Sequence, residues 1–572
     1  MRAASRPAVS RPAASRRRPF YILAFVLTLG AGALLGTGFA YGDDFFAMKK
    51  NFTIFGELYE ELATGYVDPV DPERMMRAGI EAMLGTLDPY TVFIDEAANE
   101  DIDIVTRGRY GGVGVTVSLR GERFTVVEVV EGYSAAEVGM RPGDTILSVD
   151  GTSTDEFEQD DLRALLRGTP GTTVDLTVER EGEPGALAFT LTRAEIQLKN
   201  VTHAGFLGDE AAGVGYVRLE RFARTAGSEV EDAIVTMQAQ ANETGRTLSG
   251  LVLDLRGNRG GLLDQAVEIV GHFVPQGSVV VSTRGRAAES ERVYRSEAAP
   301  IALDVPLVVL VDGVSASASE IVAGALQDHD RAVVLGETTF GKGLVQIIRP
   351  LPYNTSLKMT TSKYYIPSGR SIQSITYWRD EAGGHADEVP DSLRRAFETL
   401  GGRTVFDGQG INPDIEASLG PVSELEEALV RRAAFFRFAN RFAAETPTLP
   451  TGFAVDDALL ARFRAFVDAE DIAYETRAER MLAELVADLD EAGYDATDDE
   501  VADLRAELID EKEADFERHA PRLRERLRQE ILSRYVGQPA QVATSLGTDP
   551  QLKQAVAVLG NRSQYRSVLS PR

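Results

Sequence analysis

The residues of this sequence that could do chemistry are a serine and a lysine in two short neighbouring motifs. Ser317 stands where an apolar, strand-like run gives way to a helix-like run, and Lys342 stands in a Phe-Gly-Lys-Gly turn. A serine hydroxyl becomes a good nucleophile only when a nearby base takes its proton, and a lysine can be that base if burial keeps it neutral. The pair therefore predicts a hydrolase with a serine nucleophile and a lysine base.

The elements around this pair would supply its supporting groups. Residues 309–311 predict a buried strand and residues 319–326 a helix, so Ser317 would lie at a helix start, where the amide of Ala318 could stabilise an oxyanion. Residues 344–348 predict a strand, in which alternate residues share a face. Gln346 would then face the same way as Lys342 and could hold the lysine in place without adding charge.

The same residues allow other interpretations. Ser317 could be only a helix cap and Lys342 only an exposed turn lysine. Residues 336–342 fit the GxxxxGK pattern of a phosphate-binding loop, but Gly343 follows where a Ser or Thr is needed, and a strand is predicted next instead of a helix. A Ser-His-Asp triad with His329 fails because the predicted helix would separate His329 from Ser317 by more than about 12 Å, at about 1.5 Å per residue.

Composition excludes several further classes of function. The chain has no cysteine, only 5 histidines and no HExxH motif, so neither a metal site nor a cofactor is predicted. Its net charge of −28 argues against binding to nucleic acid. The length of 572 residues, with 44% hydrophobic residues, predicts several domains with substantial cores.

Several segments together resemble the signature of the C-terminal processing peptidases, also called tail-specific proteases. The matching segments are residues 315–320 (SASASE), 323–328 (AGALQD), 339–343 (TFGKG), 254–261 (DLRGNRGG), 363–373, 410–414 and Gln346. The resemblance implies that Ser317 is the nucleophile, Lys342 the base and Gln346 the residue that orients the lysine. It also implies that Gly261 gives a second oxyanion amide beside that of Ala318. Arg259 departs from the family, which commonly has proline or a small residue there.

The N-terminus predicts a membrane anchor. Residues 1–19 are basic, and residues 20–42 form an uncharged, mostly apolar run that is long enough to span a bilayer. The arginines predict a cytoplasmic tail, with everything after the span exported, as in a single-pass protein of the inner membrane with a periplasmic catalytic part. A cleavable signal peptide remains the alternative, since small residues at 38–40 offer a cleavage site.

A peptide-binding module is predicted between the anchor and the hydrolase motifs. Residues 105–196 contain short alternating strands, turns and a helix at 161–166, and they look like a PDZ domain. Its carboxylate-binding loop would include Gly112, Val113, Gly114 and Val115, because glycines let successive amides approach a chain terminus. Residues 87–90 (LDPY) resemble the family's LDPH segment, with Tyr90 in place of histidine.

The predicted fold is a multidomain α+β protein. Its parts are the basic tail (1–19), the anchor (20–42), a helical region (43–104), the PDZ domain (105–196), an α/β protease core (197–418) and a helical C-terminal region (419–572). Helices are expected at 433–444 and 478–492 and along the charged stretch 499–534. The apolar stripe Leu552, Ala555, Val558 and Leu559 could dock on the core.

These features predict an envelope serine endopeptidase. It would bind protein substrates by their C-terminal segments in the PDZ groove and cleave them through an acyl-enzyme. The alternatives are a membrane-anchored PDZ adaptor with an inactive core and a hydrolase of small esters or amides that uses the same dyad. An adaptor protein or a second copy of the chain remains open as a partner.

Overall fold

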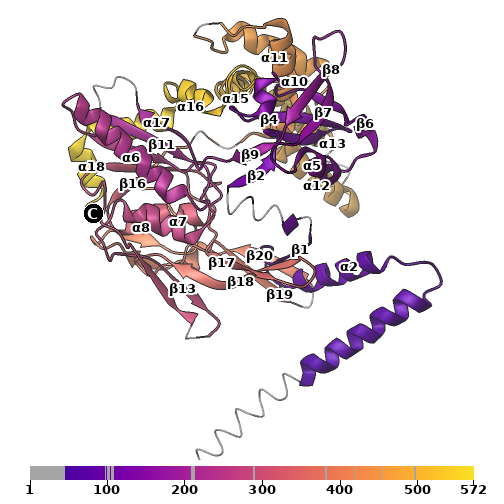
Figure 1. Cartoon of the computed structure of the whole chain (residues 1–572), viewed down its shortest axis with the longest axis horizontal. Helices are drawn as coiled ribbons and strands as arrows, with labels where there is room; N and C mark the ends of the chain where they lie inside the picture. Colours follow the sequence, from indigo (N-terminus) through magenta and orange to yellow (C-terminus); the bar gives the residue numbers. More distant parts are fainter. Residues whose placement is uncertain are drawn as a thin grey trace, which may run out of the picture. The chain divides into compact units, whose positions relative to one another are not determined.

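The computed structural model describes residues 46–96, 98–99, 104, 108–207, 213–287, 290–380, 383–418, 420, 422–450, 452–494 and 498–571. The chain divides into two compact units, residues 1–86 and 87–572 (Figure 1). The predicted basic tail at 1–19 and the predicted anchor at 20–42 lie outside the described residues.

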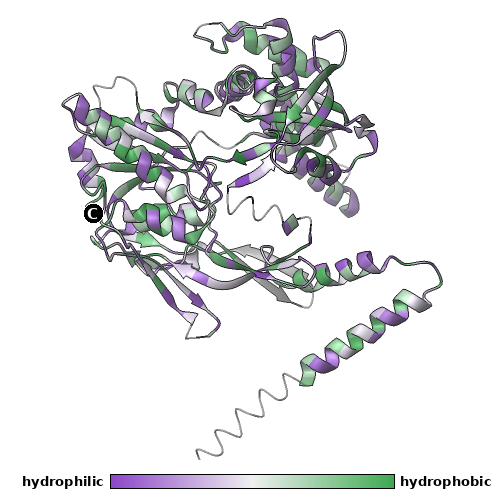
Figure 2. Cartoon of the chain, in the orientation of Figure 1, coloured by the Kyte–Doolittle hydropathy of each residue, from purple (hydrophilic) through white to green (hydrophobic). Residues whose placement is uncertain are grey.

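The first unit is helical. Residues 46–65 form one helix, and α2 (Pro72–Leu84) follows, with the Asp71 carboxylate capping its first turn through the amides of Glu73 and Arg74. Hydrophobic and hydrophilic residues alternate along both helices (Figure 2). Among the residues described, no helix combines the length and apolar character needed to cross a bilayer.

The helical region ends earlier than the sequence predicted. Beyond α2, residues 92–94 form β1 (Val92–Ile94), which pairs with a strand of the protease core. Valine, phenylalanine and isoleucine favour a pleated surface over a helix, and the Pro89 turn that precedes them allows the change of direction.

The predicted PDZ domain is a small antiparallel sheet with one main helix. The sheet contains β3 (Val115–Arg120), β4 (Arg123–Val129), β5 (Thr145–Val149), β6 (Thr152–Ser153), β7 (Thr173–Glu179) and β8 (Leu187–Thr192). Helix α5 (Gln159–Leu166) confirms the helix predicted at 161–166, and α4 (Ser134–Glu137) is a single turn. A separate pair, β2 (Arg109–Gly112) and β9 (Ala194–Gln197), closes the domain at its two ends. Alternate strand residues such as Val174, Leu176 and Val178 fill its core.

The protease core is built on a six-stranded sheet in the order β10-β11-β12-β15-β16-β23. Its strands are β10 (Val201–Phe206), β11 (Val214–Leu219), β12 (Gly250–Asp254), β15 (Leu307–Val311), β16 (Ala332–Gly336) and β23 (Ile415–Glu416), and all neighbours except β10 and β11 are parallel. Every residue of β12, β15 and β16 is buried, which is the pattern of parallel strands covered on both faces.

Alternate residues of these strands face different layers. Leu251, Leu253, Val309 and Val334 pack with α6 (Ala226–Glu243), α7 (Leu263–Gly271) and α8 (Ala318–Asp328). The intervening residues, such as Val252, Val308 and Val333, pack instead with α17 (Pro550–Gly560) through Leu552, Ala555, Val558 and Leu559. The predicted docking of that stripe is confirmed, and the C-terminal region therefore completes the protease core.

A second sheet carries the lysine motif. It contains β1, β13 (Val279–Gly285), β14 (Arg292–Arg295), β17 (Leu344–Pro350) and β18 (Ser356–Tyr365), with β18 pairing β1, β13 and β17. The hairpins β19 (Ile375–Asp380) with β20 (Gly383–Glu388) and β21 (Ala396–Glu398) with β22 (Thr404–Phe406) follow.

The C-terminal region contains nine further helices among the described residues. They are α9 (Glu424–Arg431), α10 (Ala434–Glu445), α11 (Asp457–Ala469), α12 (Arg477–Ala492), α13 (Asp498–Glu513), α14 (Asp515–Arg518), α15 (Ala520–Leu532), α16 (Gln538–Leu546) and α18 (Arg562–Val568). Helices α9, α10, α11, α14 and α15 build a separate core, whereas α16 and α18 pack beside α17 on the protease sheet. Phe435, Phe438, Phe463 and Phe516 pack together at the centre of the separate core. The helices predicted at 433–444 and 478–492 are confirmed, whereas the stretch 499–534 is divided into three helices.

Candidate active site

Ser317 lies at the turn between β15 and α8, in a conformation that non-glycine residues rarely adopt. Its φ is 57° and its ψ is −112°. Such backbone strain persists only where the surroundings hold it, and it is concentrated at functional sites. Here the amide of Ser317 donates to Glu320 Oε2 at 2.8 Å, and the preceding amide, of Ala316, donates to Asn258 O at 3.0 Å. The turn is therefore held in a form that leaves Ser317 partly exposed at the helix start.

Lys342 lies in the loop between β16 and β17, partly buried. Burial, and secondly the positive charge of Lys358, lower the pKa of Lys342 to about 8, while Glu320 and Asp88 offset part of that effect. Its Nζ lies 4.4 Å from the centre of the Tyr90 ring. At neutral pH an appreciable fraction of this lysine is neutral, which is the state that a general base requires.

Glu320, a residue not singled out from the sequence as part of the site, joins the two motifs. Its Oε2 accepts from the amides of Ser317 at 2.8 Å and Lys342 at 2.9 Å. Its Oε1 accepts from the amide of Gly341 at 2.7 Å and from Thr339 Oγ1 at 2.6 Å. The side chain is fully buried, and burial raises the pKa of Glu320 to about 7, whereas the four donors favour its ionised form. The sequence signal was present, because Ser-x-x-Glu at a helix start is a capping box.

Tyr364 of β18 also connects the two motifs. Its hydroxyl donates to the carbonyl oxygen of Lys342 and lies 3.2 Å from the carbonyl oxygen of Ser317. The residue is 1% exposed. Two buried side chains, Glu320 and Tyr364, thus fix the backbones of Ser317 and Lys342 relative to each other.

Gln346 lies close to this centre but makes a different contact from the one predicted. Its amide nitrogen donates to Thr360 Oγ1 at 3.1 Å, and Thr360 Oγ1 donates to Asp88 Oδ1 at 3.1 Å. Among the residues described, no hydrogen bond joins Gln346 to Lys342. The pairing of β17 with β18 shifts between Val345 and Gln346, and such an irregularity interrupts the strict alternation on which the prediction depended.

The glycine loop after β12 packs against the serine turn. A Cβ added to Gly260 would lie 2.9 Å from the Ser317 Cβ and 2.8 Å from the Ala318 amide nitrogen, so only glycine fits at this approach, where φ is +92°. The amide of Gly260 already donates to Asn258 Oδ1 at 2.9 Å. Gly261 follows at the same edge, and the assignment of its amide and that of Ala318 to an oxyanion hole stays a prediction.

The structure also agrees with the rejection of the histidine triad and of the phosphate-binding loop. His329 caps the far end of α8, where its Nε2 lies 2.7 Å from the carbonyl oxygen of Val279. Strand β17, and not a helix, follows Lys342, so residues 336–350 do not form a phosphate-binding loop.

The predicted PDZ groove is a cavity of about 750 Å³ between β3 and α5. Gly112, Val113 and Val115 line it, whereas Gly114, with φ of +85°, is not among the lining residues. Pro539, at the start of α16, lies in the same lining. One lining residue of this groove therefore comes from the C-terminal region, which the sequence alone did not predict.

Comparisons with known proteins agree with this architecture. Residues 213–380 match peptidase family S41, residues 125–180 match a PDZ domain, and residues 425–559 match the C-terminal helical domain of probable PDZ-proteases. The chain is 38% identical over 326 residues to the carboxy-terminal-processing protease of Bartonella bacilliformis, covering 57% of this chain and 73% of that relative. It is 33% identical over 385 residues to the carboxyl-terminal-processing protease of Synechocystis, covering 64% of this chain and 88% of that relative.

A solved structure is similar as well. The photosystem II D1 C-terminal processing protease is 28% identical, with a TM-score of 0.35, and the match covers 63% of this chain and 86% of that one.

The fold and the matches define a serine-type peptidase with a PDZ domain. The chain belongs to the carboxy-terminal-processing proteases of peptidase family S41.

Proposed function

We propose that this chain is an envelope serine endopeptidase that recognises protein C-termini through its PDZ domain and cleaves by a Ser317–Lys342 dyad. The observation that carries the proposal is the shared attachment of the two motifs to Glu320, combined with a Lys342 pKa lowered to about 8. A positioned nucleophile beside a base that is partly neutral at physiological pH is the requirement of this chemistry.

In the proposed reaction, neutral Lys342 takes the proton from Ser317 Oγ as that oxygen attacks the substrate carbonyl. The amides of Ala318 and Gly261 stabilise the oxyanion that forms. Collapse of the intermediate expels the amine, which receives the proton from Lys342 and leaves an acyl-enzyme on Ser317. A water molecule, deprotonated by the same lysine, then hydrolyses the ester. We assign to Gln346 the orientation of Lys342, as the resemblance implies.

Substrate capture would use the PDZ groove. An extended C-terminal segment would pair with β3, and its carboxylate would bind the amides around Val113 and Gly114. The half-apolar lining, which includes Val113, Leu162 and Leu166, suits an apolar final side chain.

The location in the cell is also proposed from the sequence. Residues 20–42 would anchor the chain in the inner membrane with the catalytic part in the periplasm, and a cleaved signal peptide is the competing outcome. Resistance of the membrane-bound protein to alkaline extraction, with an intact N-terminus, supports the anchor, whereas a mature chain that starts near residue 41 overturns it.

The catalytic proposal is tested with Ser317→Ala and Lys342→Ala against an unfolded protein that ends in an apolar residue. Both variants are expected to lose cleavage and keep the melting temperature of the parent. Ser228→Ala and Lys553→Ala, at exposed positions, are matched controls that should keep full activity. Cleavage that persists in Ser317→Ala contradicts the proposal, and tail binding without any Ser317-dependent turnover would favour the inactive adaptor.

A further inference from the structure

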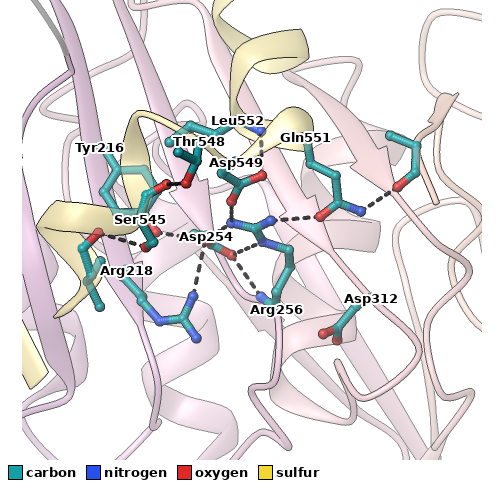
Figure 3. Close-up of polar contacts among 12 residues, drawn as sticks. Tyr216, Arg218, Asp254, Arg256, Asp312, Ser545, Thr548, Asp549, Gln551 and Leu552 are labelled. Carbon is teal, nitrogen blue, oxygen red and sulfur yellow. Dashed lines mark hydrogen bonds and ion pairs between the residues drawn. The ribbon is translucent and has the colours of Figure 1, made fainter. Parts of the chain in front are cut away.

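The first turn of α17 is hydrogen-bonded to Arg256, the residue that begins the glycine loop after β12 (residues 256–261; Figure 3). Asp549 is the N-cap of α17, and its Oδ1 accepts from the amide of Leu552 at 3.1 Å. Its Oδ2 accepts from a guanidinium nitrogen of Arg256 at 2.6 Å, and Gln551 Oε1 accepts from another at 2.7 Å. The exposed fractions of the Arg256 and Asp549 side chains are 15% and 18%, so water only partly screens this ion pair.

Arg256 is also bonded to a first carboxylate, that of Asp254, but this carboxylate does not serve Arg256 alone. Asp254, at the end of β12, is fully buried and accepts from Arg256 Nε at 2.9 Å. The same carboxylate also accepts from Arg218 at 3.3 Å and from the Tyr216 hydroxyl at 2.7 Å. Asp254 is thus shared between two guanidinium groups, and Asp549 supplies the additional negative charge on the side of Arg256.

Arg256 begins the loop that reaches the nucleophile. The next amide, that of Gly257, donates to both carboxylate oxygens of Asp312, at 3.0 and 2.9 Å. The carbonyl oxygen of Asn258 accepts from the Ala316 amide and from Ser319 Oγ on either side of Ser317. A shift of Arg256 would therefore move a short, tightly bonded loop that touches the serine turn directly.

We propose that Asp549 is a positioning residue of the protease site, through which the C-terminal region holds Arg256 and so the loop from Gly257 to Gly261. The inference rests on the proposed serine-lysine chemistry and gives the C-terminal region a direct part in it. The competing explanation is that Asp549 serves only as the cap of α17.

The test compares Asp549→Asn with the parent in the full chain. Asparagine caps helices about as well as aspartate but carries no charge, so α17 should stay folded. We expect kcat for tail cleavage to fall about tenfold with KM changed less than about twofold, because misplacing an oxyanion loop slows chemistry and not binding. Asp549→Glu, which keeps the charge, should recover at least half of kcat.

Two further measurements separate positioning from stability. Amide exchange at residues 257–262 should become faster in Asp549→Asn, while exchange at 552–559 stays as in the parent. Asp456→Asn is the matched control, since Asp456 caps α11 through the Leu459 amide at 2.8 Å, and it should change neither kcat nor loop exchange.

The inference is overturned if Asp549→Asn keeps parental kcat, or if exchange rises in α17 and not in the loop. Absence of Ser317-dependent cleavage in the parent would instead reject the proposed function itself.

Discussion

At the scale of single residues, the proposed chemistry depends on the protonation state of Lys342. Burial and the neighbouring Lys358 disfavour the ammonium, whereas Glu320, Asp88 and the face of the Tyr90 ring favour it. The balance lowers the lysine pKa to about 8, which keeps it protonated often enough to deliver a proton and neutral often enough to take one.

This balance predicts the pH dependence of activity. In the proposed mechanism the neutral lysine is the base, so kcat/KM should rise with pH and reach half its maximum near pH 8, the pKa to which Lys342 is lowered. Lys342→Arg should be inactive at every pH tested, since arginine stays protonated. Cleavage rates measured from about pH 6 to about pH 10 provide the check, and a flat profile for the parent would contradict the assignment of the base.

The Tyr90 ring gives a finer prediction at the same scale. Tyr90→Leu removes the ring beneath the ammonium, and the loss of about 0.5–1 kcal/mol of cation–π attraction should lower the midpoint of the pH profile by roughly half a unit. Tyr90→Phe keeps the ring and loses only the hydroxyl contact to Tyr377, so its midpoint should stay in place. Equal midpoints in the leucine and phenylalanine variants would show that the ring does not act on the lysine.

At the scale of elements, α8 and the loop before β17 are joined by Glu320. Replacing it by glutamine leaves one acceptor oxygen for four donors, and each unsatisfied buried donor costs about 1–3 kcal/mol. Glu320→Gln should therefore lower the melting temperature and reduce kcat at least about tenfold.

The matched control for this change is Glu479→Gln. Glu479 occupies the same capping-box position in α12, far along the chain from the dyad, and its variant should keep parental kcat. Thermal unfolding and kcat are measured for both glutamine variants and for the parent. A Glu320→Gln protein with normal kcat would show that the link between the two motifs is not needed for catalysis.

The elements that were predicted correctly are those whose hydrophobic pattern is visible within a short stretch of sequence. The buried run before Ser317, the helix after it and the strand after Lys342 follow from hydrophobic pattern alone and are confirmed as β15, α8 and β17. The contacts of Tyr364 and Asp549 could not be found in this way, because they join residues 47 and 293 positions apart. The hydrogen bond from Gln346 to Thr360 was not predicted, because a register shift carries no signature in the side-chain pattern, and the role of Gln346 in orienting Lys342 stays a prediction.

At the scale of the whole molecule, binding of the protein tail and cleavage are assigned to different sets of residues. The groove is lined mainly by the PDZ domain, together with Thr202 of β10 and Pro539 of α16. Catalysis is assigned to the turns at Ser317 and Lys342. A change confined to the groove should therefore affect capture of a protein tail and leave the reactivity of the serine unchanged.

A substitution at Gly114 tests whether capture of the protein tail is separate from the reactivity of Ser317. Its φ is +85°, and an added Cβ would meet the Tyr133 Cβ at 2.8 Å, so Gly114→Ala must distort the predicted carboxylate-binding loop. Gly121 is the matched control, because its φ of +65° has the same sign but an added Cβ meets nothing within 4 Å. Gly114→Ala should raise KM for a tailed protein about tenfold or more, whereas Gly121→Ala should not. Both should react with a small serine-directed fluorophosphonate at the parental rate, and slower labelling of Gly114→Ala alone would mean that the groove also governs the serine.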